Sequence, residues 1–243
     1  MSAGYILRDA VLDKGFVELI DIMPGEIPEG AESRDIVIVN AARVSYSGES
    51  KGVESDRALL RYLWEHKHTS PFEQVIFKFR IKAPILVWWQ MDRHRTLKYS
   101  RQNRQSGRYT EYEAEEYYVP CGWRLQDSEN KQGSGSGFVE NFSVLDGASV
   151  TEVYERCFLE CLSWYKQALE DGIAREQARL FLPAFALYHT TVLNVDAWNL
   201  THFLRLRTDE KAQWEIQQYA YAMEAQFALM LPWVYACYRQ WEE

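Results

Sequence analysis

The stretch MDRHRTLKYSRQNRQSGRYT, from Met91 to Thr110, holds the residues best suited to chemistry on an anionic ligand. It carries six arginine and lysine side chains and one acid, in a chain whose net charge is -8. Ser106, Gly107 and Arg108 place a hydroxyl, an approachable backbone amide and a guanidinium side by side. Those are the components of a phosphate-binding loop.

Three functions fit a basic stretch of this kind. It could be a solvated surface, or it could bind nucleic acid, with Tyr99 and Tyr109 stacking on bases. The acidic remainder of the chain would repel a long polyanion, whereas one small phosphorylated ligand fits inside a local positive pocket. The charge balance therefore favours a mononucleotide. A nucleic-acid-binding protein that uses residues 93–108 is the alternative of another class.

Length and composition predict one soluble globular domain over residues 1–243, with 47% hydrophobic and 26% charged residues. No apolar run reaches the ~20 residues of a membrane span, and no secretory signal pattern opens the chain. We therefore expect a cytoplasmic protein without a membrane partner.

The four cysteines do not have the spacing of zinc ligands, and we expect no metal site. Cys157 and Cys161 share a helical periodicity with Val153, Trp164 and Ala168. This pattern predicts a core-facing stripe.

Strands are predicted early in the chain and helices late. QVIFKFRIK alternates as a half-buried strand does, and Pro84 then begins an apolar helix that leads into the basic stretch. Ser149 and Glu152 form a capping box, and DSENKQGSGSGF is predicted to be a surface loop. The other predicted elements are a strand over GFVELIDIM, a helix over Ser55–His66 capped by Ser55 or Asp56, a short helix through Arg179, a helix over Trp198–Leu206 and a long helix capped by Thr208.

The basic stretch resembles the signature of flavin-dependent thymidylate synthases, RHRxxSxNxxSxRY. The similarity extends in order and spacing through NAARVSY, YYVP, AREQARLFLP and HFLRLRTDEKAQWEIQQYA. It implies an α+β fold, with early antiparallel strands and a largely helical C-terminal half. It also implies a homotetramer whose active sites draw on several subunits, FAD as cofactor, and NADPH and methylenetetrahydrofolate (a folate) as co-substrates. The matching positions are Arg93, His94, Arg95, Asn103, Ser106, Arg108 and Tyr109.

The resemblance also assigns site residues. Arg207, placed just before the helix capped by Thr208, would lie beside the uracil carbonyls and stabilise charge that develops during catalysis. Ser106 would orient the substrate, because no base is spaced to activate it as a nucleophile. The uridylate would be held by Gln90, Arg93, Arg104, Gln105, Ser106, Gly107, Arg108, Arg179 and Arg207. The flavin would be held by His68, Ser70, Glu73, Arg93, His94, Arg95, Asn103, Asp196 and His202.

Three departures from the family pattern bear on the substrate. TLKYSRQ places seven residues between RHR and Asn103 where four are usual, Arg104 stands where the family commonly has Glu or another polar residue, and Asp196–Trp198 replaces a common N-x-R. These changes resemble the family branch that methylates UMP in polyoxin biosynthesis. We therefore predict C5-methylation of UMP, with dUMP also accepted, in nucleoside antibiotic biosynthesis. The alternative is an ordinary enzyme that makes dTMP from dUMP, since a pocket discriminates against an added hydroxyl by only about a hundredfold.

Overall fold

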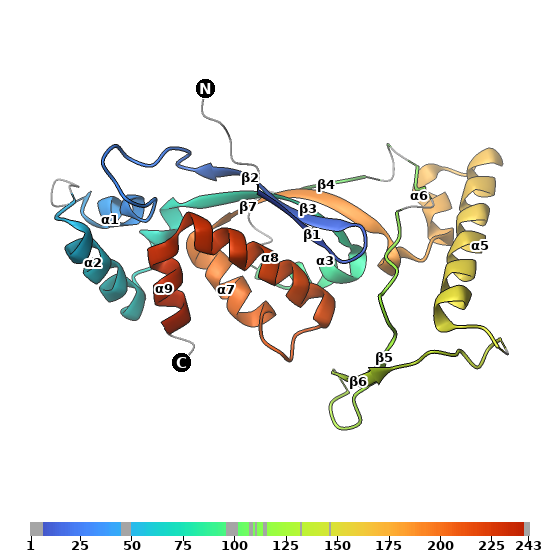
Figure 1. Ribbon diagram of the computed structural model, residues 1–243. Coiled ribbons are helices and arrows are strands. Elements are labelled where there is room, and N and C mark those ends of the chain that lie inside the picture. Colours follow the sequence, from blue (N-terminus) through green and yellow to red (C-terminus); the bar gives the residue numbers. More distant parts are fainter. Residues whose placement is uncertain are drawn as a thin grey trace.

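A computed structural model of the chain describes residues 7–44, 50–95, 102–106, 109, 111–113, 116–131, 133–145 and 147–240. Its centre is a five-stranded antiparallel sheet with the order β1-β2-β3-β7-β4 (Figure 1). The strands are β1 (Leu7–Val11), β2 (Gly15–Met23), β3 (Ile76–Pro84), β4 (Gln102–Arg104) and β7 (Tyr188–Asp196). The predicted α+β class is therefore confirmed.

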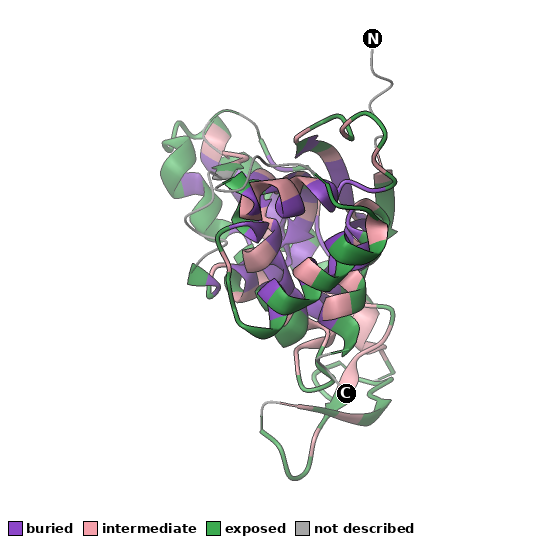
Figure 2. Cartoon of the chain, turned by 90° about the vertical axis from the view of Figure 1, so that its left-hand side faces the viewer, coloured by how far each residue is buried: buried purple, intermediate pink, exposed green. Residues whose placement is uncertain are grey.

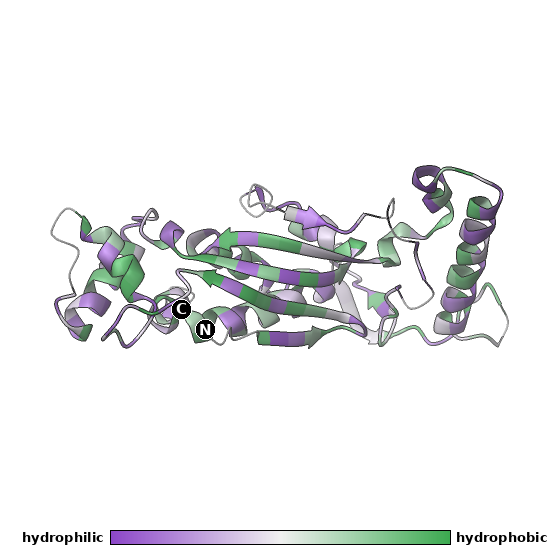
Figure 3. Cartoon of the chain, turned by 90° about the horizontal axis from the view of Figure 1, so that it is seen from above, coloured by the Kyte–Doolittle hydropathy of each residue, from purple (hydrophilic) through white to green (hydrophobic). Residues whose placement is uncertain are grey.

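Alternation along β3 decides which face of the sheet meets the core. Phe77, Phe79 and Ile81 are fully buried, whereas Lys78 and Arg80, which lie between them, are not. Three helices cover the apolar face: α7 (Ala197–Arg207), α8 (Trp214–Met230) and α9 (Pro232–Gln240). Seen from above in Figure 3, the opposite face is crossed by no helix of the described residues. Buried residues gather where the sheet meets these helices (Figure 2).

The strand β7 is the main element that the sequence does not predict. It pairs with β3 over nine residues, from Tyr188 opposite Pro84 to Asp196 opposite Ile76. From Thr191 to Asp196 buried and half-buried positions alternate, but the residue types do not, because Thr191 is buried whereas the apolar Val192 is only half-buried. The sequence therefore lacks the alternation of apolar and polar residues by which β3 is recognised.

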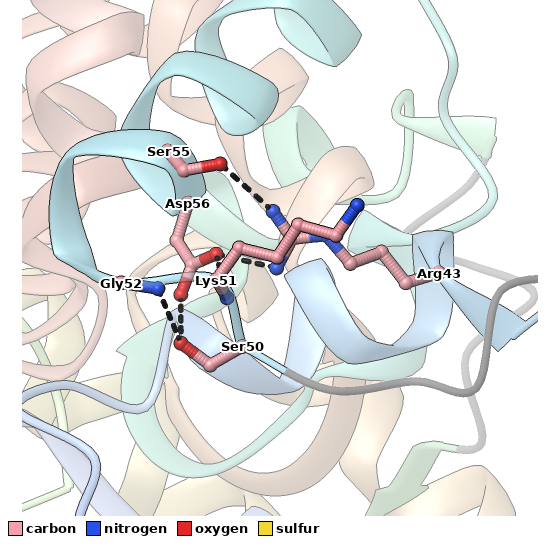
Figure 4. A network of polar contacts seen from close by, with 6 residues as sticks. All are labelled: Arg43, Ser50, Lys51, Gly52, Ser55 and Asp56. Carbon is pink, nitrogen blue, oxygen red and sulfur yellow. Dashed lines mark hydrogen bonds and ion pairs between the residues drawn. The ribbon is translucent and has the colours of Figure 1, made fainter.

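Beside the sheet lie α1 (Ile36–Ala42), α2 (Val53–Glu65) and the 3-10 turn η2 (Phe72–Gln74). A buried ion pair joins the first two: Arg43 Nη1 lies 2.5 Å from Asp56 Oδ1, and Ser50 Oγ donates to Asp56 Oδ2 at 2.5 Å (Figure 4). The predicted caps are therefore wrong. Gly52, at φ 96°, is the N-cap residue of α2, and no side chain accepts a capping hydrogen bond there. Ser55 and Asp56 both lie within the helix, with Asp56 in its first turn.

A second apolar cluster forms around α5 (Val150–Glu170), α6 (Arg175–Ala178) and the 3-10 turns η3 (Arg179–Phe181) and η4 (Ala184–Ala186). The predicted capping box of Ser149 and Glu152 is confirmed. The predicted cysteine stripe is wrong, because Cys157 is exposed and Trp164 is 52% exposed. The stripe of Phe158, Leu162 and Tyr165, one position further on, packs inward together with Ala168, which is the one buried member of the predicted stripe.

Two further boundaries differ from the prediction. Part of the Gly/Ser-rich segment forms a hairpin of β5 (Arg124–Gln126) and β6 (Ser134–Phe138). Thr208 ends α7 and begins no helix: its amide donates to the carbonyl of Leu204 at 2.8 Å. Asp209 then accepts the amide of Lys211 in a turn, so that α8 begins only at Trp214.

The helix predicted after Pro84 is confirmed as α3 (Ile85–Met91). No helix of the described residues is long and apolar enough to cross a membrane.

Candidate active site

Three of the residues assigned to uridylate, Gln90, Arg93 and Arg207, line one cavity of about 800 Å³. Gln90 lies in the last turn of α3, and Arg93 follows that helix directly. Arg207 is the last residue of α7, not a residue in front of a helix. The end of α3 and the end of α7 therefore meet at this cavity.

Arg207 is held from two sides within the cavity wall. Its Nε donates to His94 Nε2 at 2.7 Å, and its Nη2 donates to the backbone carbonyl of Gln90 at 3.3 Å. A guanidinium has five N–H donors, so most of its donors are available to a ligand. Burial and the charge of Arg93 lower the pKa of Arg207. Two cations at close range favour an anion between them.

His94 is neutral in this arrangement. Its side chain is 6% exposed, and its ring lies edge-on to Phe203 at 4.9 Å. Burial, followed by the charge of Arg207, lowers its pKa from 6.5 to about 4. The hydrogen bond from Arg207 requires a lone pair on Nε2, which only the neutral ring offers. His94 therefore orients Arg207 as an acceptor.

The stability of the protein should fall below pH 6.5 because of this histidine. In the unfolded chain His94 takes up a proton near pH 6.5, whereas in the folded chain it stays neutral until about pH 4. The unfolded chain binds more protons between these values, so that acidification favours unfolding, by about 2 kcal/mol between pH 7 and pH 5. Urea unfolding should show that His94→Gln removes this part of the pH dependence. A variant of the exposed His66, His66→Gln, serves as control, and equal slopes in both variants would contradict the assignment.

Arg104 and Gln105, also assigned to uridylate, contact other parts of the protein and do not line the cavity. The Arg104 guanidinium makes two hydrogen bonds to Asp92, of 2.8 and 3.2 Å, and lies 4.9 Å from the centre of the Trp88 ring. The side chain of Gln105 accepts the amide of Thr190 at 3.3 Å. Both residues therefore fasten β4 and the residues that follow it to α3 and β7.

Two of the four remaining uridylate residues, Ser106 and Arg179, are described and do not line this cavity. Ser106 is half-buried after β4, and its carbonyl accepts the amide of Tyr109. Arg179 is exposed in η3, where its Nε donates to the carbonyl of Glu176. The other two, Gly107 and Arg108, lie outside the described residues.

The residues assigned to the flavin fall in several places. Asp196 caps α7, where its carboxylate accepts the amide of Asn199 at 2.9 Å. His202 lines a smaller cavity of about 190 Å³, and its ring centre lies 6.4 Å from that of His94. His68, Ser70 and Glu73 are exposed between α2 and β3, Arg95 is exposed after α3, and Asn103 is exposed on β4.

The smaller cavity has chemistry that suits part of a flavin dinucleotide. Lys67 and Arg205 bring positive charge to its wall, and Trp64 and Trp198 bring aromatic rings. Its volume is below the about 300–1,000 Å³ of typical small-molecule sites. It can therefore hold only one part of such a ligand, with the remainder on the surrounding surface.

Sequence reasoning missed the far wall of the large cavity. Arg124 of β5 forms a 2.5 Å ion pair with Glu215 at the start of α8. Trp123 and Tyr154 pack edge to face at 5.0 Å, and Lys131 and Lys211 also line the cavity. Arg124 and Glu215 are 91 positions apart, and Lys131 lies in a segment predicted to be a plain loop. No spacing rule connects these residues.

Two other kinds of catalysis would use a cysteine nucleophile or a bound metal ion. None of the four cysteines lines the large cavity, and Cys121 lines a different one. A thiolate nucleophile therefore has no place among the described walls of the large cavity. The described residues also contain no group of three or more His, Cys, Asp and Glu side chains arranged to hold a metal ion.

Comparison with known proteins identifies the family. The family described as thymidylate synthase complementing protein (Thy1) matches residues 28–233. The flavin-dependent thymidylate synthase of Thermus thermophilus is 42% identical over 95% of this chain and 77% of its own length. That of Kosmotoga olearia is 39% identical over 94% and 91%.

Solved structures agree with this assignment. The UMP/dUMP methylase PolB from Streptomyces cacaoi, bound with 5-Br dUMP, has a TM-score of 0.73 at 31% identity and covers 96% of this chain and 97% of its own. Its complex with 5-Br UMP has a TM-score of 0.74 at 32% identity, with coverage of 93% and 94%. The protein therefore belongs to the flavin-dependent thymidylate synthase family, as the resemblance in its basic stretch indicated.

Proposed function

We propose that the protein methylates the C5 position of UMP, and also of dUMP, with methylenetetrahydrofolate as carbon donor and with FAD and NADPH. The observation that carries the proposal is the meeting of Gln90, Arg93 and Arg207 in one cavity, in a chain of this family. Similar structures bound with 5-Br UMP and 5-Br dUMP support a uridine nucleotide as substrate.

Different residues of the cavity would bind the phosphate, recognise the uracil and stabilise charge during catalysis. Arg93 offers a charge to the phosphate, and the Gln90 amide has both a donor and an acceptor, which suits the edge of uracil. Arg207, whose orientation His94 fixes, would stabilise the negative charge that develops on the base as C5 becomes nucleophilic. Ser106 and Arg179 are assigned to the same ligand and do not line this cavity, so they would reach it from another subunit of the proposed homotetramer.

FAD, once reduced by NADPH, would supply the hydride that completes the methyl group. The chain would hold it through His202 with the charges and rings of the smaller cavity, and through the exposed group of His68, Ser70 and Glu73. Asp196 would contribute indirectly, because its carboxylate holds the first turn of the helix that carries both His202 and Arg207.

The preference for UMP is the finer part of the proposal. Arg104, which stands where the family commonly has Glu or another polar residue, pairs with Asp92 and so fastens β4 beside Arg93. The long insertion precedes this fixed point in sequence and lies largely outside the described residues. A loop lengthened next to an anchored strand would leave room for the ribose 2'-hydroxyl. A UMP preference would set the protein apart from enzymes that make dTMP, since dTMP synthesis requires dUMP, and would fit the proposed role in nucleoside antibiotic biosynthesis.

The purified protein should bind FAD without a covalent bond. Denaturation should release flavin, or added FAD should raise the melting temperature, because a ligand at 100 times its Kd stabilises by about 2.7 kcal/mol. Riboflavin, which lacks the phosphates, is the control and should raise it less. A protein that releases no flavin and does not respond to FAD would contradict the proposed cofactor.

A further inference from the structure

The large cavity has a second end that the proposed uridylate site does not use. Its volume of about 800 Å³ lies toward the upper limit of small-molecule sites, about 300–1,000 Å³. Gln90, Arg93 and Arg207 form one wall, at the ends of α3 and α7. The other wall comes from the hairpin of β5 and β6 and from the turn that precedes α8.

Positive charge remains uncompensated at this second end. Lys131 lies in the hairpin turn and Lys211 in the turn after α7, and neither side chain forms an ion pair with any residue in the described parts of the chain. Glu215 is the single acid among the described lining residues. Arg124 neutralises it at 2.5 Å, and the Tyr118 hydroxyl donates to it at 3.3 Å. The one carboxylate of the described lining is therefore already paired with Arg124, and both lysines add positive charge to the cavity.

Two aromatic side chains, Trp123 and Tyr154, line the same cavity as these lysines. The indole of Trp123 donates to Thr151 at 2.9 Å, and the hydroxyl of Tyr154 donates to the carbonyl of Tyr118 at 2.6 Å. These two bonds fix both rings, which also pack edge to face against each other. Fixed aromatic faces bind flat ring systems at little entropic cost.

We propose that this second end, formed by Lys131, Lys211, Trp123 and Tyr154, binds a ligand with an aromatic body and an anionic tail while uridylate occupies the first end. The inference rests on the proposed function, which requires two such co-substrates. The glutamate carboxylates of a folate and the phosphates of NADPH share this chemistry. Bound folate would place the one-carbon donor beside the base, and bound NADPH would bring the reductant to the same cavity.

The test uses the full-length protein loaded with FAD and saturated with UMP. Calorimetric titration measures the affinity for tetrahydrofolate triglutamate and, separately, for NADP⁺. The double variant Lys131→Ala with Lys211→Ala should bind one of these two ligands about tenfold more weakly. Each exposed charge contact contributes up to about 1 kcal/mol, so the loss of two such contacts accounts for a factor of about ten. The double variant with arginine at both positions should bind as the unmodified protein does. Lys166→Ala, on the far part of α5, is the matched control for loss of an exposed lysine.

The results distinguish folate carboxylates from NADPH phosphates at the lysines, and they test this inference separately from the proposed function. Weaker binding of the triglutamate, with a smaller loss for the monoglutamate, identifies carboxylates at the lysines. Weaker binding of NADP⁺ alone identifies phosphates. Unchanged affinity for both, with UMP binding intact, overturns this inference and leaves the proposed function standing. Failure of the unmodified protein to bind UMP overturns both.

Discussion

Replacing Arg207 with alanine should lower kcat on UMP by about 10²–10³, the usual effect of removing one preorganised donor from developing charge. Arg207 lines the cavity and is held by His94 at 2.7 Å and by the carbonyl of Gln90. Its loss would remove a cation that is fixed before the reaction begins. The measurement is single-turnover kinetics with saturating UMP, so that weaker binding does not enter the rate.

Two further variants make this result specific. Arg207→Lys keeps the charge but loses the forked donors, and should recover only part of the rate. Arg156→Ala, an exposed arginine on α5, should leave the rate unchanged. A kcat for Arg207→Ala within threefold of the unmodified enzyme would show that Arg207 does not act on the transition state.

Replacing Asp56 with alanine should destabilise the fold by about 3–5 kcal/mol, because a buried charge would lose its partner. The side chains of Arg43 and Asp56 are 8% and 1% exposed. Ser50 and the amide of Lys51 also donate to the Asp56 carboxylate, which lowers its pKa even though burial alone would raise it. Urea unfolding followed by tryptophan fluorescence at fixed protein concentration measures the change.

The double variant Arg43→Met with Asp56→Leu distinguishes an unpaired charge from lost packing. It removes both charges, and it should recover much of the stability that Asp56→Ala loses. Glu113→Ala breaks an exposed ion pair with Lys166 and should cost less than about 1 kcal/mol. Equal losses in Asp56→Ala and Glu113→Ala would contradict the assigned role of the buried pair.

Local patterns in the sequence predict the elements whose signal lies within a few neighbouring residues. The alternation of β3, the proline at the start of α3 and the capping box of α5 are of this kind. A local pattern that occurs both at helix starts and in turns can give a wrong prediction. Thr208 followed by two acids is typical of a helix start, yet here Thr208 ends α7 and Asp209 forms a turn. The strand β7 owes its place to pairing with β3, more than one hundred positions earlier.

The large cavity likewise contains residues that were predicted from the sequence and residues that only the fold brings together. Gln90, Arg93 and Arg207 were assigned through resemblance, and the fold brings all three to one wall. Arg124, Glu215 and Lys211 were not predicted, because their meeting depends on how a hairpin lies against the start of a distant helix. The substrate role predicted for Arg104 stays a prediction, and its bonds to Asp92 favour a positioning role.

The most direct test of the account is transfer of labelled carbon from methylenetetrahydrofolate to C5 of UMP. The protein is incubated with FAD, NADPH and either UMP or dUMP, and the nucleotide product is analysed by mass spectrometry. The account predicts 5-methyl-UMP, formed with kcat/KM at least equal to that on dUMP. Turnover of dUMP with no detectable product from UMP would contradict it and would make this an ordinary thymidylate synthase.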